Sequence, residues 1–274
     1  MNMYGFITWD VSPEIVNFGF WALRYYSLFF ASGFIISHFV MQDIFNKDGR
    51  TAEELDTLTL YMIGATIIGA RLGHCLFYEP DYFLKHPLEI LQVWNGGLAS
   101  HGATVGILTA LYFFSKKAKV GYLWILDRIV IVVALCGGLI RLGNLMNSEI
   151  VGKPTDLPWG FIFVQNGENF ARHPSQLYEG ITTFMLFGIL WFMYLKTNAK
   201  HKTGLIFGIF CTVLFSLRIY YEFLKENQVE FENDMVLNMG QILSIPMVLV
   251  GIWCIIRSQN TKTATPEMVN SRTV

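Results

Sequence analysis

The sequence predicts an all-α polytopic membrane protein with seven transmembrane helices. Hydrophobic residues make up 53% of the 274-residue chain and charged residues only 15%, a more apolar balance than that of a soluble domain of this size. Seven apolar stretches each approach the ~20 residues that a helix needs to cross the hydrocarbon core. The predicted spans are 18–40, 58–77, 96–115, 123–140, 172–195, 204–223 and 236–256.

The distribution of basic residues predicts the orientation of these spans. Eleven lysines and arginines fall on one side: Lys47, Arg50, Lys116, Lys117, Lys119, Lys196, Lys200, Lys202, Arg257, Lys262 and Arg272. The opposite side holds four, Lys85, Lys153, Arg172 and Lys225. Because cytoplasmic loops are enriched in positive charge, we expect the N-terminus outside and the C-terminus in the cytoplasm. The net charge of −1 hides this segregation and gives no sign of a nucleic-acid partner, and we expect none.

We expect one seven-helix transmembrane domain over residues 1–257, with outer loops at 78–95, 144–172 and 225–235. The loop 144–172 is rich in Pro, Gly and Asn, and a long segment without periodicity inside a compact fold is usually functional. Residues 258–274 are polar and lack helical periodicity, so we expect a disordered cytoplasmic tail.

The most informative stretch is 141–153. Arg141 directly follows the apolar run 129–140, and Asn144 and Glu149 come within the next turns. A guanidinium so close to the bilayer is costly unless a partner requires it, and an anionic lipid head group is such a partner. The alternative is an arginine that snorkels to the interface at a helix end.

In the predicted orientation, all seven spans bring polar side chains to their outer ends. The residues concerned are Tyr25, Tyr26, Arg71, His74, His101, Arg141, 173–179, Arg218, Glu222 and 238–244. Since the membrane penalises each of them, we interpret their shared depth as one active site near the outer face, open to the outer leaflet.

Each of these groups also has a structural alternative. Arg71 or Arg218 alone can anchor a helix at the interface, and Arg218 with Glu222 at i,i+4 can form a plain ion pair. His101, flanked by glycines in an apolar span, can be a satisfied core histidine.

The four cysteines, Cys75, Cys136, Cys211 and Cys254, are widely spaced and each lies in an apolar run. Without a C-x-x-C pair they are typical of small core residues. We therefore expect no metal site and no disulfide framework. We expect no cofactor either.

Five blocks of sequence resemble the prolipoprotein diacylglyceryl transferase family. They are GGLASHG at 96–102, RLGNLMNSEIVG at 141–152, RHPSQLYE at 172–179, RIYYE at 218–222 and MGQILSIP at 239–246. The resemblance implies a multi-pass enzyme of the bacterial plasma (inner) membrane. Such an enzyme moves the diacylglyceryl group of phosphatidylglycerol onto the lipobox cysteine of a preprolipoprotein and releases glycerol 1-phosphate.

By motif, the resemblance implies that Arg141 binds the phosphate of phosphatidylglycerol and that Arg218 assists it. The candidate catalytic residues are His101, Arg141, Arg218, Glu149 and Tyr26, and the candidate substrate-binding residues are Arg141, Asn144, Gly152, Arg71, Arg218 and Glu222. A neutral imidazole at His101 is suited to take the thiol proton. The chain departs from the family pattern at Ile140 and Ser148, where glycine is usual, and at Ala103, where a second glycine is common.

The alternative function is a membrane transporter or a binder of anionic lipid head groups. A transporter would favour ionisable groups near the midplane and inverted repeats with broken helices. Here the ionisable groups cluster at the outer ends of the predicted spans, which favours the enzyme.

Overall fold

The structure is a computed structural model that describes residues 5–19, 22–226, 232 and 235–260 of the 274-residue chain. Its helices are α1 (Tyr25–Lys47), α2 (Ala52–Phe77), α3 (Pro80–Phe83), α4 (Ser100–Lys117), α5 (Tyr122–Met146), α6 (Ser175–Lys196), α7 (Leu205–Glu222) and α8 (Met239–Asn260). The 3-10 turns are η1 (Pro87–Leu91), η2 (Val93–Asn95), η3 (Val164–Asn166) and η4 (Asn198–His201). The strands are β1 (Ile7–Trp9), β2 (Glu14–Asn17), β3 (Ala22–Arg24) and β4 (Phe161–Phe163).

Six helices of the described chain, α1, α2, α5, α6, α7 and α8, are long and apolar enough to cross a membrane. The prediction of a helical, multi-pass membrane protein is therefore confirmed. The third predicted span corresponds to α4, which has the same 18 residues as α7 but is outside this set because it is more polar, with His101 near its start and Lys116 and Lys117 at its end. The number of seven spans stays a prediction.

The chain divides into two compact units, Met1–Ser37 with Asp127–Val274, and His38–Leu126. We call them unit 1 and unit 2 and describe each by itself. Helices α1 and α5 contribute residues to both. The predicted single domain over residues 1–257 stays a prediction.

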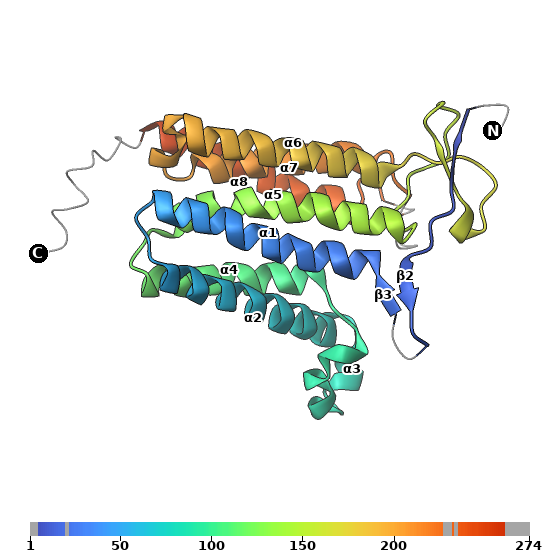
Figure 1. The fold of residues 1–274 in the computed structure, drawn as a ribbon, viewed down its shortest axis with the longest axis horizontal. Coiled ribbons are helices and arrows are strands. Elements are labelled where there is room, and N and C mark those ends of the chain that lie inside the picture. Colours follow the sequence, from blue (N-terminus) through green and yellow to red (C-terminus); the bar gives the residue numbers. More distant parts are fainter. Residues whose placement is uncertain (1–4, 20–21, 227–231, 233–234, 261–274) are drawn as a thin grey trace, which may run out of the picture. The chain divides into compact units, whose positions relative to one another are not determined.

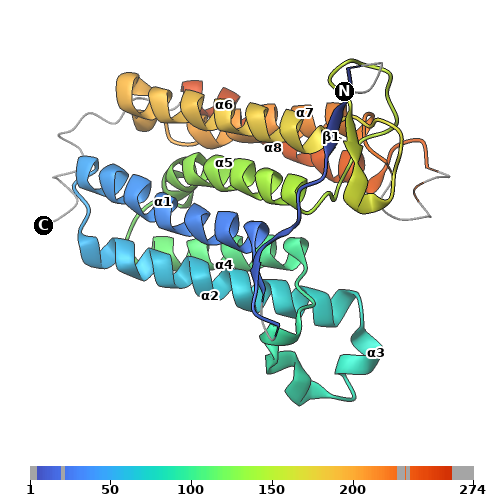
Figure 2. The same cartoon turned by 45° about the vertical axis from the view of Figure 1, so that its right-hand side comes forward.

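In unit 1, helices α5 to α8 run alongside one another (Figures 1 and 2). Helices α7 and α8 approach so closely that a Cβ on Gly208 would lie 2.8 Å from the Gly251 carbonyl oxygen. Helices α5 and α6 meet where Gly138 faces the ring of Phe184, 2.6 Å from where a Cβ would be. Small residues at such positions let helices pack through dispersion contacts, which are the main attraction between helices in lipid.

Four short strands lie outside the helices of unit 1 and were not predicted. Strand β1 pairs with β4 in parallel and β2 pairs with β3 in antiparallel fashion. Phe161 and Phe163 of β4 form a buried apolar cluster with Leu145 at the end of α5. The Trp9 indole N–H donates to the Leu145 carbonyl at 3.1 Å, so β1 and β4 are attached to the end of α5.

In unit 2, α4 packs along α2 through glycines on both helices. A Cβ on Gly69 would lie 2.5 Å from the Gly102 carbonyl oxygen, and one on Gly106 would lie 2.6 Å from the Ala65 carbonyl oxygen. The two backbones are therefore in direct contact over more than one turn. Figure 2 shows α3 beyond the end of α2, in the connection that leads back to α4.

Several predicted boundaries were wrong. The first span begins at Tyr25 because residues 22–24 are in β3. The second begins at Ala52, because a capping box formed by Thr51 and Glu54 starts the helix earlier.

Two further ends were also wrong. The fourth span continues to Met146, so residues 144–146 of the predicted outer loop are helical. Helix α8 continues to Asn260, so 258–260 are not part of a disordered tail. The remaining tail, 261–274, lies outside the described residues, as do 227–231 and 233–234 of the predicted outer loop.

Candidate functional site

Helix α5 ends in a motif that brings Glu149 back beside Asn144. The Glu149 N–H donates to the Asn144 carbonyl at 3.1 Å, and the Ser148 N–H donates to the Leu145 carbonyl at 3.0 Å. These two bonds define a Schellman motif, in which the residue after the C-cap adopts a left-handed conformation. That residue is Ser148, with φ of 53°. The chain therefore turns sharply after Met146 and stays close to the helix end.

The Asn144 side chain links Arg141 to Glu149. Its Nδ2 donates to Glu149 Oε1 at 2.7 Å, and its Oδ1 accepts from Arg141 Nη1 at 3.2 Å. Tyr26, at the start of α1, packs on the same part of α5, since a Cβ on Gly143 would lie 2.8 Å from the Tyr26 ring. Four predicted site residues therefore lie together where α1 begins and α5 ends.

Arg141 also contacts Glu179 on α6. The Nε of Arg141 lies 2.7 Å from Oε2 of Glu179, and the other oxygen of Glu179 forms an ion pair with Lys225. Glu179 and Lys225 are only 7% and 2% exposed. Charges that are so deeply buried persist only where they are paired.

Lys225 connects this pair to the end of α7. Its Nζ lies 3.1 Å from Oε1 of Glu222, and the same oxygen lies 3.7 Å from Nε of Arg218. The result is an alternating series of charges, which we call the ion-pair chain: Arg141, Glu179, Lys225, Glu222 and Arg218. The three central side chains are at most 9% exposed, whereas those of Arg141 and Arg218 are 20% and 43% exposed.

Gly152 lets three chain segments meet beside the ion-pair chain. Its N–H donates to the His173 carbonyl at 2.9 Å, and it pairs with Lys225 in an antiparallel bridge. A Cβ at this position would lie 2.5 Å from the His173 Cβ and 2.9 Å from the Leu224 carbonyl oxygen. A larger residue would push the segments apart, so Gly152 has a packing role. Its role in substrate binding stays a prediction.

In unit 2, the guanidinium of Arg71 binds backbone carbonyl groups of the connection between α2 and α4. It donates from Nε to Ile90 at 3.0 Å, from Nη1 to Gly96 at 2.7 Å and from Nη2 to Glu89 at 2.7 Å. Its Cζ also lies 4.9 Å from the centre of the Phe83 ring. Arg71 is only 5% exposed, so in this structure it holds the loop that leads into α4, and a substrate-binding role stays a prediction.

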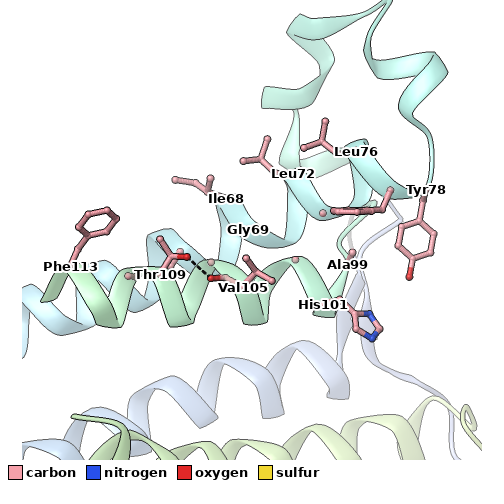
Figure 3. Close-up of a pocket in the computed structure, with 16 residues that line it drawn as sticks. Ile68, Gly69, Leu72, Leu76, Tyr78, Ala99, His101, Val105, Thr109 and Phe113 are labelled. Atoms are coloured by element: carbon pink, nitrogen blue, oxygen red, sulfur yellow. Dashed lines mark hydrogen bonds between the residues drawn. The ribbon is translucent and has the colours of Figure 1, made fainter. Parts of the chain in front are cut away.

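His101 lies at one end of an apolar groove between α2 and α4. The groove has a volume of about 750 Å³. Figure 3 shows His101 where α4 begins, with Tyr78 and Ala99 nearby, and Phe113 at the opposite end. The His101 side chain is exposed, which argues against a core histidine. Its catalytic role stays a prediction.

Seven predicted site residues lie together in unit 1: Tyr26, Arg141, Asn144, Glu149, Gly152, Arg218 and Glu222. Arg71 and His101 belong to unit 2, and their membership of the same site stays a prediction.

Lys225 was not among the predicted site residues, and Glu179 was predicted only as part of the polar stretch 173–179, without a catalytic or substrate-binding role. The sequence does contain a signal for Lys225, because Arg218, Glu222 and Lys225 have the i, i+4, i+7 spacing of one helix face. The same reasoning does not find Glu179, because its pairing with Lys225 depends on how α6 and α7 pack.

Comparison with known proteins identifies the family of this chain. The model of the family described as "Prolipoprotein diacylglyceryl transferase" matches residues 13–257. The chain belongs to this family. The match extends from the residue before β2 to the last turn of α8, so it includes every charged residue of the ion-pair chain.

Proteins named phosphatidylglycerol–prolipoprotein diacylglyceryl transferase are similar to this member of the family over nearly its full length. The protein of Chloroherpeton thalassium is 46% identical over 259 residues, which cover 94% of this chain and 96% of the relative. Those of Tolumonas auensis and Porphyromonas gingivalis are 42% and 40% identical and cover 93% and 94% of this chain, and 98% and 96% of their own. Membership of this family makes the chain a transferase and gives no support to the alternative of a transporter or head-group binder.

Proposed function

We propose that this protein transfers the diacylglyceryl group of phosphatidylglycerol to the thiol of the lipobox cysteine of a prolipoprotein, the first step of lipoprotein maturation. The observation that carries the proposal is the ion-pair chain, which ends in the partly exposed guanidinium groups of Arg141 and Arg218. Planar guanidinium groups bind phosphate through two parallel hydrogen bonds. Phosphatidylglycerol supplies such a phosphate.

The reaction forms one C–S bond and breaks one C–O bond. The cysteine thiolate of the prolipoprotein attacks the primary carbon of the diacylglyceryl group, which bears the phosphate. The electron pair of the broken C–O bond leaves with the phosphate, so the co-product is glycerol 1-phosphate. Negative charge accumulates on this leaving group, where Arg141 and Arg218 stabilise it.

The proton of the attacking thiol needs an acceptor. We assign this role to His101, because its side chain is exposed at the start of α4 and a neutral imidazole accepts protons near neutral pH. Asn144 and Glu149 orient Arg141 through the hydrogen bonds at the end of α5. Because both the nucleophile and the leaving group come from the substrates, this chemistry needs no cofactor.

The proposal includes the arrangement in the membrane. Because α4 packs along α2 through backbone contacts at Gly69 and Gly106, we assign α4 as a seventh span, antiparallel to α2. The N-terminus is then outside and the C-terminus cytoplasmic in the bacterial inner membrane. Phosphatidylglycerol and lipobox-containing prolipoproteins bind near the outer face.

A transfer assay tests the function directly. The purified protein is incubated with phosphatidylglycerol labelled in its acyl chains and a peptide that contains a lipobox cysteine. The expected product is a peptide that carries the label through a thioether, and the control is the same peptide with serine in place of cysteine. Movement of phosphatidylglycerol across liposomes without peptide labelling would support the transporter instead.

A further inference from the structure

The ammonium of Lys225 occupies the centre of the ion-pair chain. It contacts a carboxylate oxygen of Glu179 and lies 3.1 Å from one of Glu222. Each of these glutamates also pairs with an arginine. Glu179 contacts Arg141 through its other oxygen at 2.7 Å, and Glu222 contacts Arg218 through the same oxygen at 3.7 Å. A single lysine therefore joins the two arginines to which we assign phosphate binding.

We propose that Lys225 is a positioning residue for phosphate recognition, which holds both glutamates and through them the guanidinium groups of Arg141 and Arg218. This inference rests on the proposed function, because it concerns the phosphate of phosphatidylglycerol. Lys225 itself is 2% exposed. It acts through the arginines and does not touch the lipid.

The burial of Lys225 argues that its charge is required where it lies. Lysine is among the residues least often buried, and an unpaired buried ammonium costs several kcal/mol, so that two carboxylate partners are needed to offset the loss of water. The backbone holds the residue in the same place, since Gly152 pairs with Lys225 and the Lys153 N–H donates to the Leu224 carbonyl at 2.8 Å.

The charge balance of the site depends on this lysine. The ion-pair chain, together with Glu149, which is linked to Arg141 through Asn144, contains three positive groups, Arg141, Arg218 and Lys225, and three negative groups, Glu149, Glu179 and Glu222. Three positive and three negative charges give a net charge of zero. Without Lys225 the same groups have a net charge of −1, which would repel the phosphate that the arginines have to bind.

A lipid-binding comparison tests the inference on the full-length protein in nanodiscs. Lys225→Met removes the charge, and Lys153→Met removes an exposed lysine beside Gly152 as the matched control. The dissociation constants for phosphatidylglycerol and for diacylglycerol, which has no phosphate, are measured for each variant.

We expect Lys225→Met to weaken phosphatidylglycerol binding at least about tenfold and diacylglycerol binding by less than about twofold. The control should change neither. Equal losses for both lipids would mean that Lys225 is only structural.

A second variant keeps the test decisive if Lys225→Met does not fold. This double variant, Glu179→Gln with Lys225→Met, removes one charge of each sign. The buried charge is then balanced again, so thermal stability should recover. Because Arg141 loses its anchor, we expect phosphatidylglycerol binding to stay at least about tenfold weaker. Recovery of both stability and phosphatidylglycerol binding would overturn the inference.

The wild-type protein separates this inference from the proposed function. If it prefers phosphatidylglycerol to diacylglycerol but transfers nothing to the lipobox peptide, the proposed function is wrong and the role of Lys225 in phosphate recognition still stands. If it transfers lipid normally and Lys225→Met keeps its phosphatidylglycerol affinity, the function stands and the role of Lys225 is wrong.

Discussion

The Nε of Arg141 on α5 lies 2.7 Å from Oε2 of Glu179 on α6. The Arg141 Nη1 donates at the same time to Asn144 at 3.2 Å. The two contacts together fix the direction of the guanidinium. We assign phosphate binding to the remaining donors of Arg141.

Arg141→Lys should lower the transfer rate by about 10²-fold or more, because an ammonium keeps the charge but not the planar fork that binds phosphate in the transition state. The measurement is kcat/KM for phosphatidylglycerol with a fixed lipobox peptide. Arg24→Lys is the matched control, since Arg24 is 58% exposed and pairs only loosely with Glu14 at 3.4 Å. Equal activity of the Arg141 variant and the control would remove Arg141 from phosphate binding.

His101→Gln should bind phosphatidylglycerol nearly as well as the wild type but turn over slowly. Glutamine keeps a hydrogen-bonding group but cannot take the thiol proton, a contribution worth about 10²- to 10⁴-fold in rate. The rate should recover in part as pH rises, because the thiolate then forms without a base. The control is His86→Gln, which changes an exposed histidine of the loop before α4. Near-wild-type turnover of His101→Gln at neutral pH would make this histidine structural.

Replacement of Cys75, Cys136, Cys211 and Cys254 together by alanine should leave transfer measurable. All four are free thiols in the described chain, and all except Cys136 are buried. In the proposed reaction the substrate supplies the nucleophile. Some loss of stability is expected from the cavities, and the thermal unfolding midpoint reports it. A folded variant without turnover would show that the enzyme supplies a thiol.

Ser148→Gly should raise thermal stability. Ser148 has φ of 53°, a conformation that costs a non-glycine residue about 1 kcal/mol and that glycine adopts freely. The Ser148 hydroxyl is buried and has no hydrogen-bond partner among the described residues, so its removal loses no bond. We expect a higher unfolding midpoint at a fixed scan rate and unchanged transfer activity.

Ser115→Gly, inside α4, is the contrasting control and should destabilise the protein. An unchanged or lower midpoint for Ser148→Gly would contradict strain at this position.

A reporter that is active only in the cytoplasm should work when it is fused after Lys119 or Lys200 and fail after Asp156. The first two sites follow α4 and α6 at ends rich in lysine, and Asp156 lies between α5 and α6. A reporter active only outside should give the opposite pattern. Reversed signals would overturn both the orientation and the outward-facing site.

The approximate positions of most long helices could be predicted from the sequence because hydropathy is a local property of each segment. The ends of the helices could not, because they depend on specific contacts. Helix α5 runs on to Met146 through residues as polar as Asn144, and it stops where Ser148 adopts a left-handed conformation. Helix α2 starts earlier than predicted because of the capping box at Thr51.

Most of the candidate site could also be selected from the sequence. Arg141, Asn144 and Glu149 are close in the chain, and Arg218 and Glu222 are one turn apart on α7, so spacing and motif were enough to select them. That Glu179 and Lys225 join these two groups is visible only in the folded protein. The physical reason is that an ion pair between residues on different helices depends on how those helices pack. Gly152, where a Cβ would collide with His173, helps to set that packing.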